Sequence, residues 1–170
     1  MLPPKVARMM INLGCQTSDI RHQTSEIRIL DPFCGVGTVL AEALIIGKEV
    51  IGSDIDPKQV ERTRKNLAWL GKKIPLIVSD ARKIFEKVPP VEAIVTETDL
   101  GPKASLNQLY FDCFKHWQNK VKTVVIALPS LNVIDKLKSI GYTLVGGPFE
   151  YARPQAKVKR NIVVLKYGTH

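Results

Sequence analysis

Three aspartates, each placed at the end of a short apolar run, are the residues whose types and spacing first suggest chemistry in this sequence. They are Asp31, Asp54 and Asp80. If the three runs are neighbouring parallel strands, their carboxyl ends meet at one edge of a sheet, which is where such sheets bind ligands. Carboxylates gathered there attract cationic or amine groups and repel phosphate. The sequence therefore predicts a ligand site at this edge.

The loop that follows the first aspartate carries two glycines. Residues 31–38 read DPFCGVGT, and Gly35 and Gly37 would let a ligand approach the backbone at a helix N-terminus. The alternative is a tight strand-to-helix turn capped by Thr38. Leu40 stands where a dinucleotide fingerprint needs its third glycine, and the loop lacks the Gly-Lys-Ser/Thr of a phosphate-binding loop. A nicotinamide dehydrogenase and a phosphate loop are both disfavoured.

The other two aspartates have spacings that suit an adenosine group. Asp54 lies 19 residues after Gly35, close to the roughly 20-residue separation at which an acid binds ribose hydroxyls. Ile55 would offer an apolar face to an adenine ring, whereas Asp56 is explained as a helix N-cap. Asp80 could accept a hydrogen bond from an adenine amino group, or could cap the helical turn that follows it.

Alternating strand and helix patterns must position these residues. The β-branched runs predict strands over residues 27–30, 50–53, 76–78, 91–96, 121–128, 142–145 and 161–167. Helical spacing predicts helices over residues 6–13, 38–46, 57–70, 106–117 and 131–140, the first of them ended by Gly14. Strand–helix–strand repeats predict an α/β fold with a mostly parallel sheet and helices on both faces, closed by an antiparallel pair near the C-terminus.

The composition fits one globular domain. The chain has 170 residues, of which 45% are hydrophobic, and a net charge of +9. We expect a single domain over residues 1–170, with an N-terminal helix and polar connector over 1–26 and the core over 27–170. No apolar run is long enough for a membrane span and no secretory signal is recognisable, so a cytoplasmic protein is expected. The three cysteines and three histidines lack the spacing of a metal site.

The motifs DPFCGxGT, IGSDID and SDA together resemble the cofactor half of class I S-adenosylmethionine-dependent methyltransferases. Residues 2–8, LPPKVAR, further resemble an RNA methylase family that includes tRNA guanine-N2 methyltransferases. The resemblance implies a Rossmann-like methyltransferase fold of seven strands, S-adenosyl-L-methionine as cofactor, and methyl transfer to an exocyclic amino group of RNA, with guanine N2 of tRNA as the expected target. Family members often carry a separate RNA-binding domain ahead of this one. Since the chain leaves no room for it, such a domain or a partner chain is an expected source of RNA binding.

The resemblance also implies roles for individual residues. The methionine moiety would contact Asp31, Gly35 and Gly37, the ribose Asp54, and the adenine Ile55, Asp80 and Ala81. The full set of implied cofactor contacts is Asp31, Pro32, Phe33, Gly35, Gly37, Thr38, Asp54, Ile55, Asp80 and Ala81.

The catalytic motif departs from the family pattern. Amino-group methyltransferases of this type carry Asp or Asn, two prolines, and Tyr or Phe after the fourth strand; here the four residues are Glu97, Thr98, Asp99 and Leu100. An attacking amine needs alignment and an acceptor for its developing charge, which Glu97 or Asp99 could provide. The alternatives are a solvated turn, a catalytically silent methyltransferase-like module, or a DNA amino-methyltransferase of the same fold.

Of two basic segments in the sequence, one is predicted to contact RNA. Residues 151–160 link the last two predicted strands and contain four cations and a tyrosine, so Arg153, Lys157 and Arg160 are predicted to contact phosphates. A merely solvated loop is the alternative. Either Phe149 or Tyr151 could replace the missing aromatic ring. A second basic set is interpreted as the solvent-exposed face of a helix. It consists of Lys58, Arg62, Lys65, Lys72 and Lys73.

Overall fold

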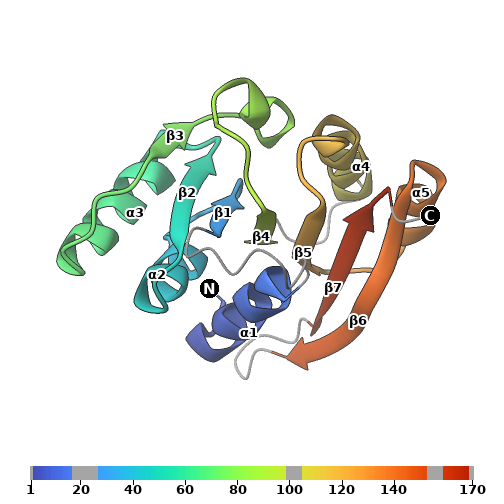
Figure 1. Ribbon diagram of the computed structural model, residues 1–170, viewed down its shortest axis with the longest axis horizontal. Helices are drawn as coiled ribbons and strands as arrows, with labels where there is room; N and C mark the ends of the chain where they lie inside the picture. Colours follow the sequence, from blue (N-terminus) through green and yellow to red (C-terminus); the bar gives the residue numbers. More distant parts are fainter. Residues whose placement is uncertain (1, 17–26, 99–104, 153–158, 169–170) are drawn as a thin grey trace.

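A single seven-stranded sheet with helices on both faces organises the chain in the computed structural model (Figure 1). The structure describes residues 2–16, 27–98, 105–152 and 159–168. The strands are β1 (Arg28–Asp31), β2 (Glu49–Asp54), β3 (Leu76–Val78), β4 (Ala93–Glu97), β5 (Thr123–Leu128), β6 (Tyr142–Ala152) and β7 (Lys159–Tyr167). The helices are α1 (Pro4–Cys15), α2 (Thr38–Ile45), α3 (Pro57–Trp69), η1 (Ala81–Glu86), α4 (Ser105–Trp117) and α5 (Ile134–Ser139).

The sheet order is β3-β2-β1-β4-β5-β7-β6. The first five strands pair in parallel, and β7 lies antiparallel between β5 and β6. The predicted Rossmann-like α/β fold, with seven strands and the last one inserted antiparallel, is therefore confirmed. This order brings the carboxyl ends of β1, β2, β3 and β4 to one edge, where parallel sheets bind ligands.

Alternating strand residues divide the core into two layers. Ile29 and Val50 face α1, α2 and α3, whereas Leu30 and Ile51 face η1, α4 and α5, as the arrangement in Figure 1 shows. Successive side chains of a strand point to opposite faces, and a parallel sheet covered on both faces therefore needs apolar residues at nearly every position. The β5 sequence TVVIAL is buried throughout for this reason.

The end of the first helix differs from the sequence-based expectation, whereas the turn after β3 agrees with it. Gly14 was expected to end the first helix, but α1 continues through it to Cys15. A Cβ at Gly14 would lie 2.9 Å from Val95 Cγ2, so the glycine allows the helix to approach the sheet closely. The connection from β3 to β4 contains the six-residue 3₁₀ helix η1, the helical turn that Asp80 was expected to cap.

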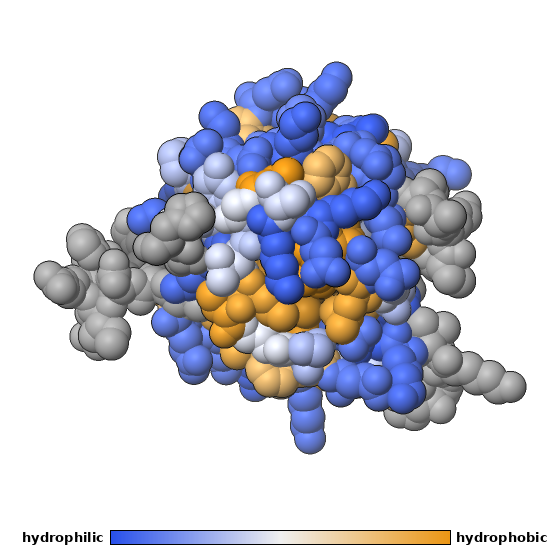
Figure 2. All heavy atoms as spheres, turned by 90° about the vertical axis from the view of Figure 1, so that its right-hand side faces the viewer, coloured by the Kyte–Doolittle hydropathy of each residue, from blue (hydrophilic) through white to orange (hydrophobic). Residues whose placement is uncertain are grey.

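The last hairpin also differs from expectation. The strand predicted to stop at Val145 continues as β6 to Ala152, because register shifts on either side of Gly146 let it pass the Gly-Gly-Pro segment. Figure 2 views the molecule from this side, where an apolar area is surrounded by hydrophilic residues. Pro148 and the register shifts make this edge a poor template for another strand. No helix in the described ranges has the length and apolar character needed to cross a membrane.

Candidate active site

A cavity of about 590 Å³ lies at the carboxyl ends of β1, β2 and β4, and its size is typical of small-molecule sites. Nine of the ten predicted cofactor residues line it: Asp31, Pro32, Phe33, Gly35, Thr38, Asp54, Ile55, Asp80 and Ala81. Glu97, predicted to be catalytic, lines the same cavity. The structure therefore brings the two predicted halves of the site together.

Asp31 ends β1 as a buried carboxylate with 2% of its surface exposed. The Thr96 hydroxyl donates a hydrogen bond to Asp31 Oδ1 at 2.6 Å, and the Phe33 backbone N–H donates to the same oxygen at 3.1 Å. Burial raises the pKa of Asp31 to about 7, despite these two hydrogen bonds; the charges of Asp54 and Glu97 add to the rise. This carboxyl group can therefore bind a cation and exchange a proton near neutral pH.

Asp54 ties the glycine loop to the second strand. Its Oδ2 accepts a hydrogen bond from the Gly35 N–H and its Oδ1 accepts one from the Asp56 N–H, each at 3.0 Å. A carboxylate with one backbone donor on each oxygen retains lone pairs for two further donors, such as adjacent ribose hydroxyls. Ile55, next in the chain, is 68% exposed although it is apolar. The Ile55 side chain lines the cavity and provides an apolar surface there.

Gly37 is the one predicted cofactor residue that does not line the cavity. It is the N-cap of α2 with φ +87°, a left-handed conformation that favours glycine. A Cβ there would lie 2.8 Å from Thr63 Cγ2, and the Thr63 hydroxyl donates to the Gly35 carbonyl oxygen at 2.7 Å. The absence of a side chain at Gly37 thus lets Thr63 of α3 pack against the loop and bond to it. This packing accounts for a glycine at position 37 without any ligand contact.

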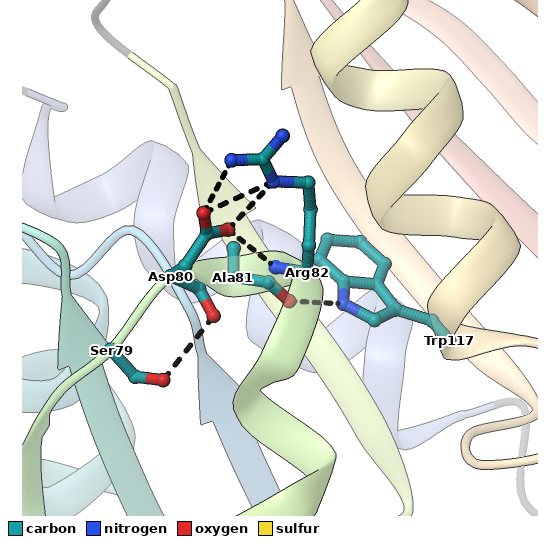
Figure 3. A network of polar contacts seen from close by, with 5 residues as sticks. All are labelled: Ser79, Asp80, Ala81, Arg82 and Trp117. Atoms are coloured by element: carbon teal, nitrogen blue, oxygen red, sulfur yellow. Dashed lines mark hydrogen bonds and ion pairs between the residues drawn. The ribbon is translucent and has the colours of Figure 1, made fainter.

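Asp80 caps η1 through its hydrogen bonds to Arg82 (Figure 3), and it also lines the cavity. Its carboxylate accepts hydrogen bonds from the Arg82 backbone and guanidinium, the shortest at 2.5 Å, and these hold the pKa of Asp80 below its usual value. The Trp117 indole N–H donates to the Ala81 carbonyl oxygen at 2.9 Å, which anchors the same turn to α4. The two interpretations of Asp80 from the sequence, cap and pocket residue, are therefore compatible.

Glu97 ends β4 with its side chain only 6% exposed. The Tyr151 hydroxyl donates a hydrogen bond to Glu97 Oε1 at 2.5 Å, and Arg160 Nε lies 3.9 Å from the same oxygen. Tyr151 and Arg160 are directly opposite each other in the β6–β7 pair. Next to Glu97, the Thr98 and Tyr110 hydroxyls are hydrogen-bonded to each other. The acid at the position of the usual catalytic Asp or Asn, at the end of β4, is therefore held by side chains from two other strands, β6 and β7.

Arg160 does not lie where the sequence suggested. It was expected in an exposed loop, but it belongs to β7 and its side chain is only 4% exposed. The reason is that β6 and β7 extend further than their β-branched runs, which draws both Tyr151 and Arg160 into paired strands. Asp99, Arg153 and Lys157 lie outside the described residues, so their predicted roles stay predictions.

Six further cavity residues were not assigned a site role from the sequence, although three of them stand in quoted motifs: Leu2, Cys34 and Thr98 do, and Gln59, Arg82 and Leu109 do not. Leu2 could have been predicted as a cavity residue only from the knowledge that α1 begins beside the cavity. Burial raises the pKa of the Cys34 thiol to about 12, so at neutral pH Cys34 is a neutral thiol and a poor nucleophile. Gln59 Oε1 is buried and has no hydrogen-bond partner among the described residues, which leaves an acceptor for a ligand donor.

Several curated proteins that are similar to this chain are named tRNA (guanine(10)-N2)-dimethyltransferases. The tRNA (guanine(10)-N2)-dimethyltransferase of Methanothermobacter thermautotrophicus is 45% identical over 108 residues, which cover 61% of this chain and 29% of the relative. The protein of the same name from Pyrococcus abyssi is 32% identical over 97% of this chain and 50% of the relative. The chain thus spans half or less of the length of these two relatives.

A solved structure has the same fold. The crystal structure of TrmN from Thermus thermophilus superposes with a TM-score of 0.79 at 23% identity, over 98% of this chain and 49% of that one. The family model described as "RMKL-like, methyltransferase domain" matches residues 2–138. These residues include the whole cavity lining, from Leu2 to Leu109. The chain therefore belongs to the RMKL-like methyltransferase domain family.

Proposed function

We propose that this chain transfers a methyl group from S-adenosyl-L-methionine to an exocyclic amino group of RNA, with guanine N2 of tRNA as the target. The observation that carries the proposal is that one cavity joins the acids and apolar surface suited to an adenosine and amino-acid ligand to an anchored acid, Glu97. The curated relatives, both named tRNA guanine-N2 dimethyltransferases, support the choice of substrate.

The residues present fit the cofactor. Asp54 has free lone pairs for ribose hydroxyls, Ile55 has an exposed apolar face for adenine, and Gln59 Oε1 is a buried acceptor awaiting a donor. Asp31 would pair with the amino group of the methionine moiety, since a buried carboxylate is stabilised by a cation. When bound, S-adenosylmethionine supplies an electrophilic methyl group on a sulfonium.

Glu97 would act on the target amine. The amine nitrogen forms a bond to the methyl carbon while the carbon–sulfur bond breaks, and the nitrogen then gives up a proton. The Glu97 carboxylate would accept a hydrogen bond from the amine as positive charge develops on it, and would then receive the proton. Tyr151 and Arg160 would fix the carboxylate in place of the rigid Pro-Pro turn. The Tyr151 side chain packs against the core cluster that contains α1 and α2 and reaches Glu97 only through its hydroxyl, so it does not line the cavity as a substitute for the missing ring.

RNA binding would come in part from elsewhere. Since the chain spans half or less of its curated relatives, we propose that a separate domain or a partner chain contributes to holding the tRNA. A test of the proposed function should therefore measure methyl transfer to one nucleotide of the tRNA, and not the affinity of this chain for the whole tRNA.

The test is radiolabel transfer from S-adenosylmethionine into tRNA transcripts. We expect label in a guanosine transcript and none when inosine, which lacks the N2 amine, replaces the target guanosine. Glu97→Gln should slow transfer about 100-fold or more, with the affinity for S-adenosylhomocysteine changed less than about twofold. Label in inosine transcripts, or full activity of Glu97→Gln, would contradict the proposal, and label only in duplex DNA would favour the DNA enzyme.

A second candidate is a catalytically silent module. The replacement of both prolines by Thr98 and Asp99, and the ion pair that occupies Glu97, favour it. It predicts tight binding of S-adenosylhomocysteine with no label in any nucleic acid.

A further inference from the structure

The outer surface of α3 carries a row of cations that ends in an exposed tryptophan. Lys58, Arg62, Lys65 and Trp69 follow one another at spacings of four, three and four residues, and all four are exposed. At 3.6 residues per turn these positions lie within about 60° of one another around the helix axis. We call these four residues the α3 stripe.

The α3 stripe points directly into solvent. Val60, Thr63 and Leu67, the buried residues of α3, lie on the opposite side of the helix. Beyond the helix end, the exposed Lys72 and Lys73 continue the positive charge. With the described residues, none of these five cations forms an ion pair, whereas Arg64 on the flank pairs with Glu61. The stripe therefore presents uncompensated positive charge along its whole length.

Trp69 is not explained by a solvated helix face. Its surface is 89% exposed, the largest fraction among the exposed large hydrophobic residues. Lysines and arginines are common on the solvent-exposed face of a helix, but covering an exposed indole with another apolar surface is energetically favourable. Surfaces that hold single-stranded nucleic acid combine cations along the backbone with aromatic rings on which bases stack. The α3 stripe has both components in one row.

We propose that the α3 stripe is an RNA-contact surface, with its cations on successive phosphates and Trp69 stacked on an unpaired base. The substrate class rests on the proposed function. The first turn of α3 lines the cavity through Gln59, and the helix extends about 20 Å from there. RNA lying along the stripe would therefore have one end beside the cavity and the other at Trp69. Charge complementarity selects a polyanion over an apolar partner.

Tryptophan fluorescence tests the stacking part directly. The chain has two tryptophans, and the other one, Trp117, is 1% exposed. Titration with tRNA transcript should quench the emission of Trp69 and protect it from iodide. In Trp69→Phe, which keeps a ring, tRNA should still bind but leave the remaining emission unchanged. Trp69→Ala should weaken binding on the order of 5- to 100-fold. Saturating tRNA that leaves Trp69 emission and iodide access unchanged would overturn the proposal and indicate a polypeptide partner for this surface.

Charge reversal tests the phosphate part with a matched control. The double variant Arg62→Glu/Lys65→Glu should reduce the slope of log affinity against log salt by about 1.4 to 1.8, since each lost phosphate contact removes about 0.7 to 0.9. Lys115→Glu/Lys136→Glu makes the same change in net charge at exposed positions of α4 and α5, on the other face of the sheet. This control should leave the slope almost unchanged. Equal effects of the two variants would refute a specific surface.

These binding measurements separate the two proposals, because they need neither cofactor nor turnover. If the stripe variants lose tRNA affinity while no protein transfers label, the α3 stripe stands and the proposed function fails. If the wild type methylates tRNA and the stripe variants bind it equally well, the proposed function stands and the α3 stripe is refuted.

Discussion

Binding of the cofactor product should release a proton from Asp31. Burial raises the pKa of this carboxyl group to about 7, so in the free protein it is largely protonated below neutral pH. A ligand amine favours the ionised carboxylate and must displace the proton to pair with it. Affinity therefore rises with pH up to about 7, whereas a solvated carboxylate with the usual pKa of about 4 would already be ionised at pH 5.5 and would give a flat profile from there to neutral pH.

The magnitude follows from the ionised fraction. With a pKa of about 7, roughly 3% of Asp31 is ionised at pH 5.5 and about 50% at pH 7.0, which predicts about 15-fold tighter binding at the higher pH. Of the charged groups that line the cavity, Asp54 and Glu97 are the two whose charges also raise the pKa of Asp31. Titration calorimetry with S-adenosylhomocysteine at pH 6, in buffers of different ionisation enthalpy, should report about 0.9 proton released per ligand.

Two variants isolate the effect. Asp31→Asn keeps an oxygen to accept the Thr96 hydrogen bond but cannot ionise, so its affinity should be flat between pH 5.5 and 7.0. Asp54→Asn should bind more weakly at every pH, because it loses an acceptor, but should keep the rise with pH. A flat wild-type profile, or a rise that persists in Asp31→Asn, would refute the assignment of the ligand amine to Asp31.

Two further predictions concern Tyr151 in β6 and the glycine Gly37 at the start of α2. Tyr151→Phe removes the donor that fixes Glu97 and should lower kcat about 10-fold or more, with the affinity for S-adenosylhomocysteine unchanged; an equal loss of cofactor affinity would instead mean that the hydroxyl supports the whole cavity. Gly37→Ala places a Cβ against Thr63 at φ +87°, whereas Gly47→Ala has φ +76° and open space around its Cβ. Both should lose about 1 kcal/mol or more through backbone strain, and urea unfolding should show a larger loss for Gly37→Ala; equal losses would show that the Thr63 contact is unimportant.

The sheet edge that gathers the predicted cofactor residues could be predicted because its geometry follows from local chain connectivity. Asp31, Asp54 and Asp80 each follow a strand, and parallel strands joined by crossovers place their carboxyl ends at one edge regardless of the details of packing. The division of the core into two faces follows in the same way from the two-residue period of a strand. The role of Asp56 as the N-cap of α3 could also be predicted, since its side chain accepts a hydrogen bond from the backbone N–H of Lys58, two residues further along the chain.

The catalytic half depended on contacts that no local pattern encodes. Tyr151 meets Glu97 across 54 residues of sequence, and it does so only because β6 passes its register shifts and pairs with β7 as far as Arg160. A shift of one residue would turn these side chains to the other face of the sheet. Gly14 and Gly37 likewise owe their places to a close approach by Val95 and Thr63. The sequence by itself therefore determined the fold, its binding edge and the acids that follow the strands, whereas the tertiary structure alone decided what anchors Glu97, because register and helix approach are set by packing across the whole sheet.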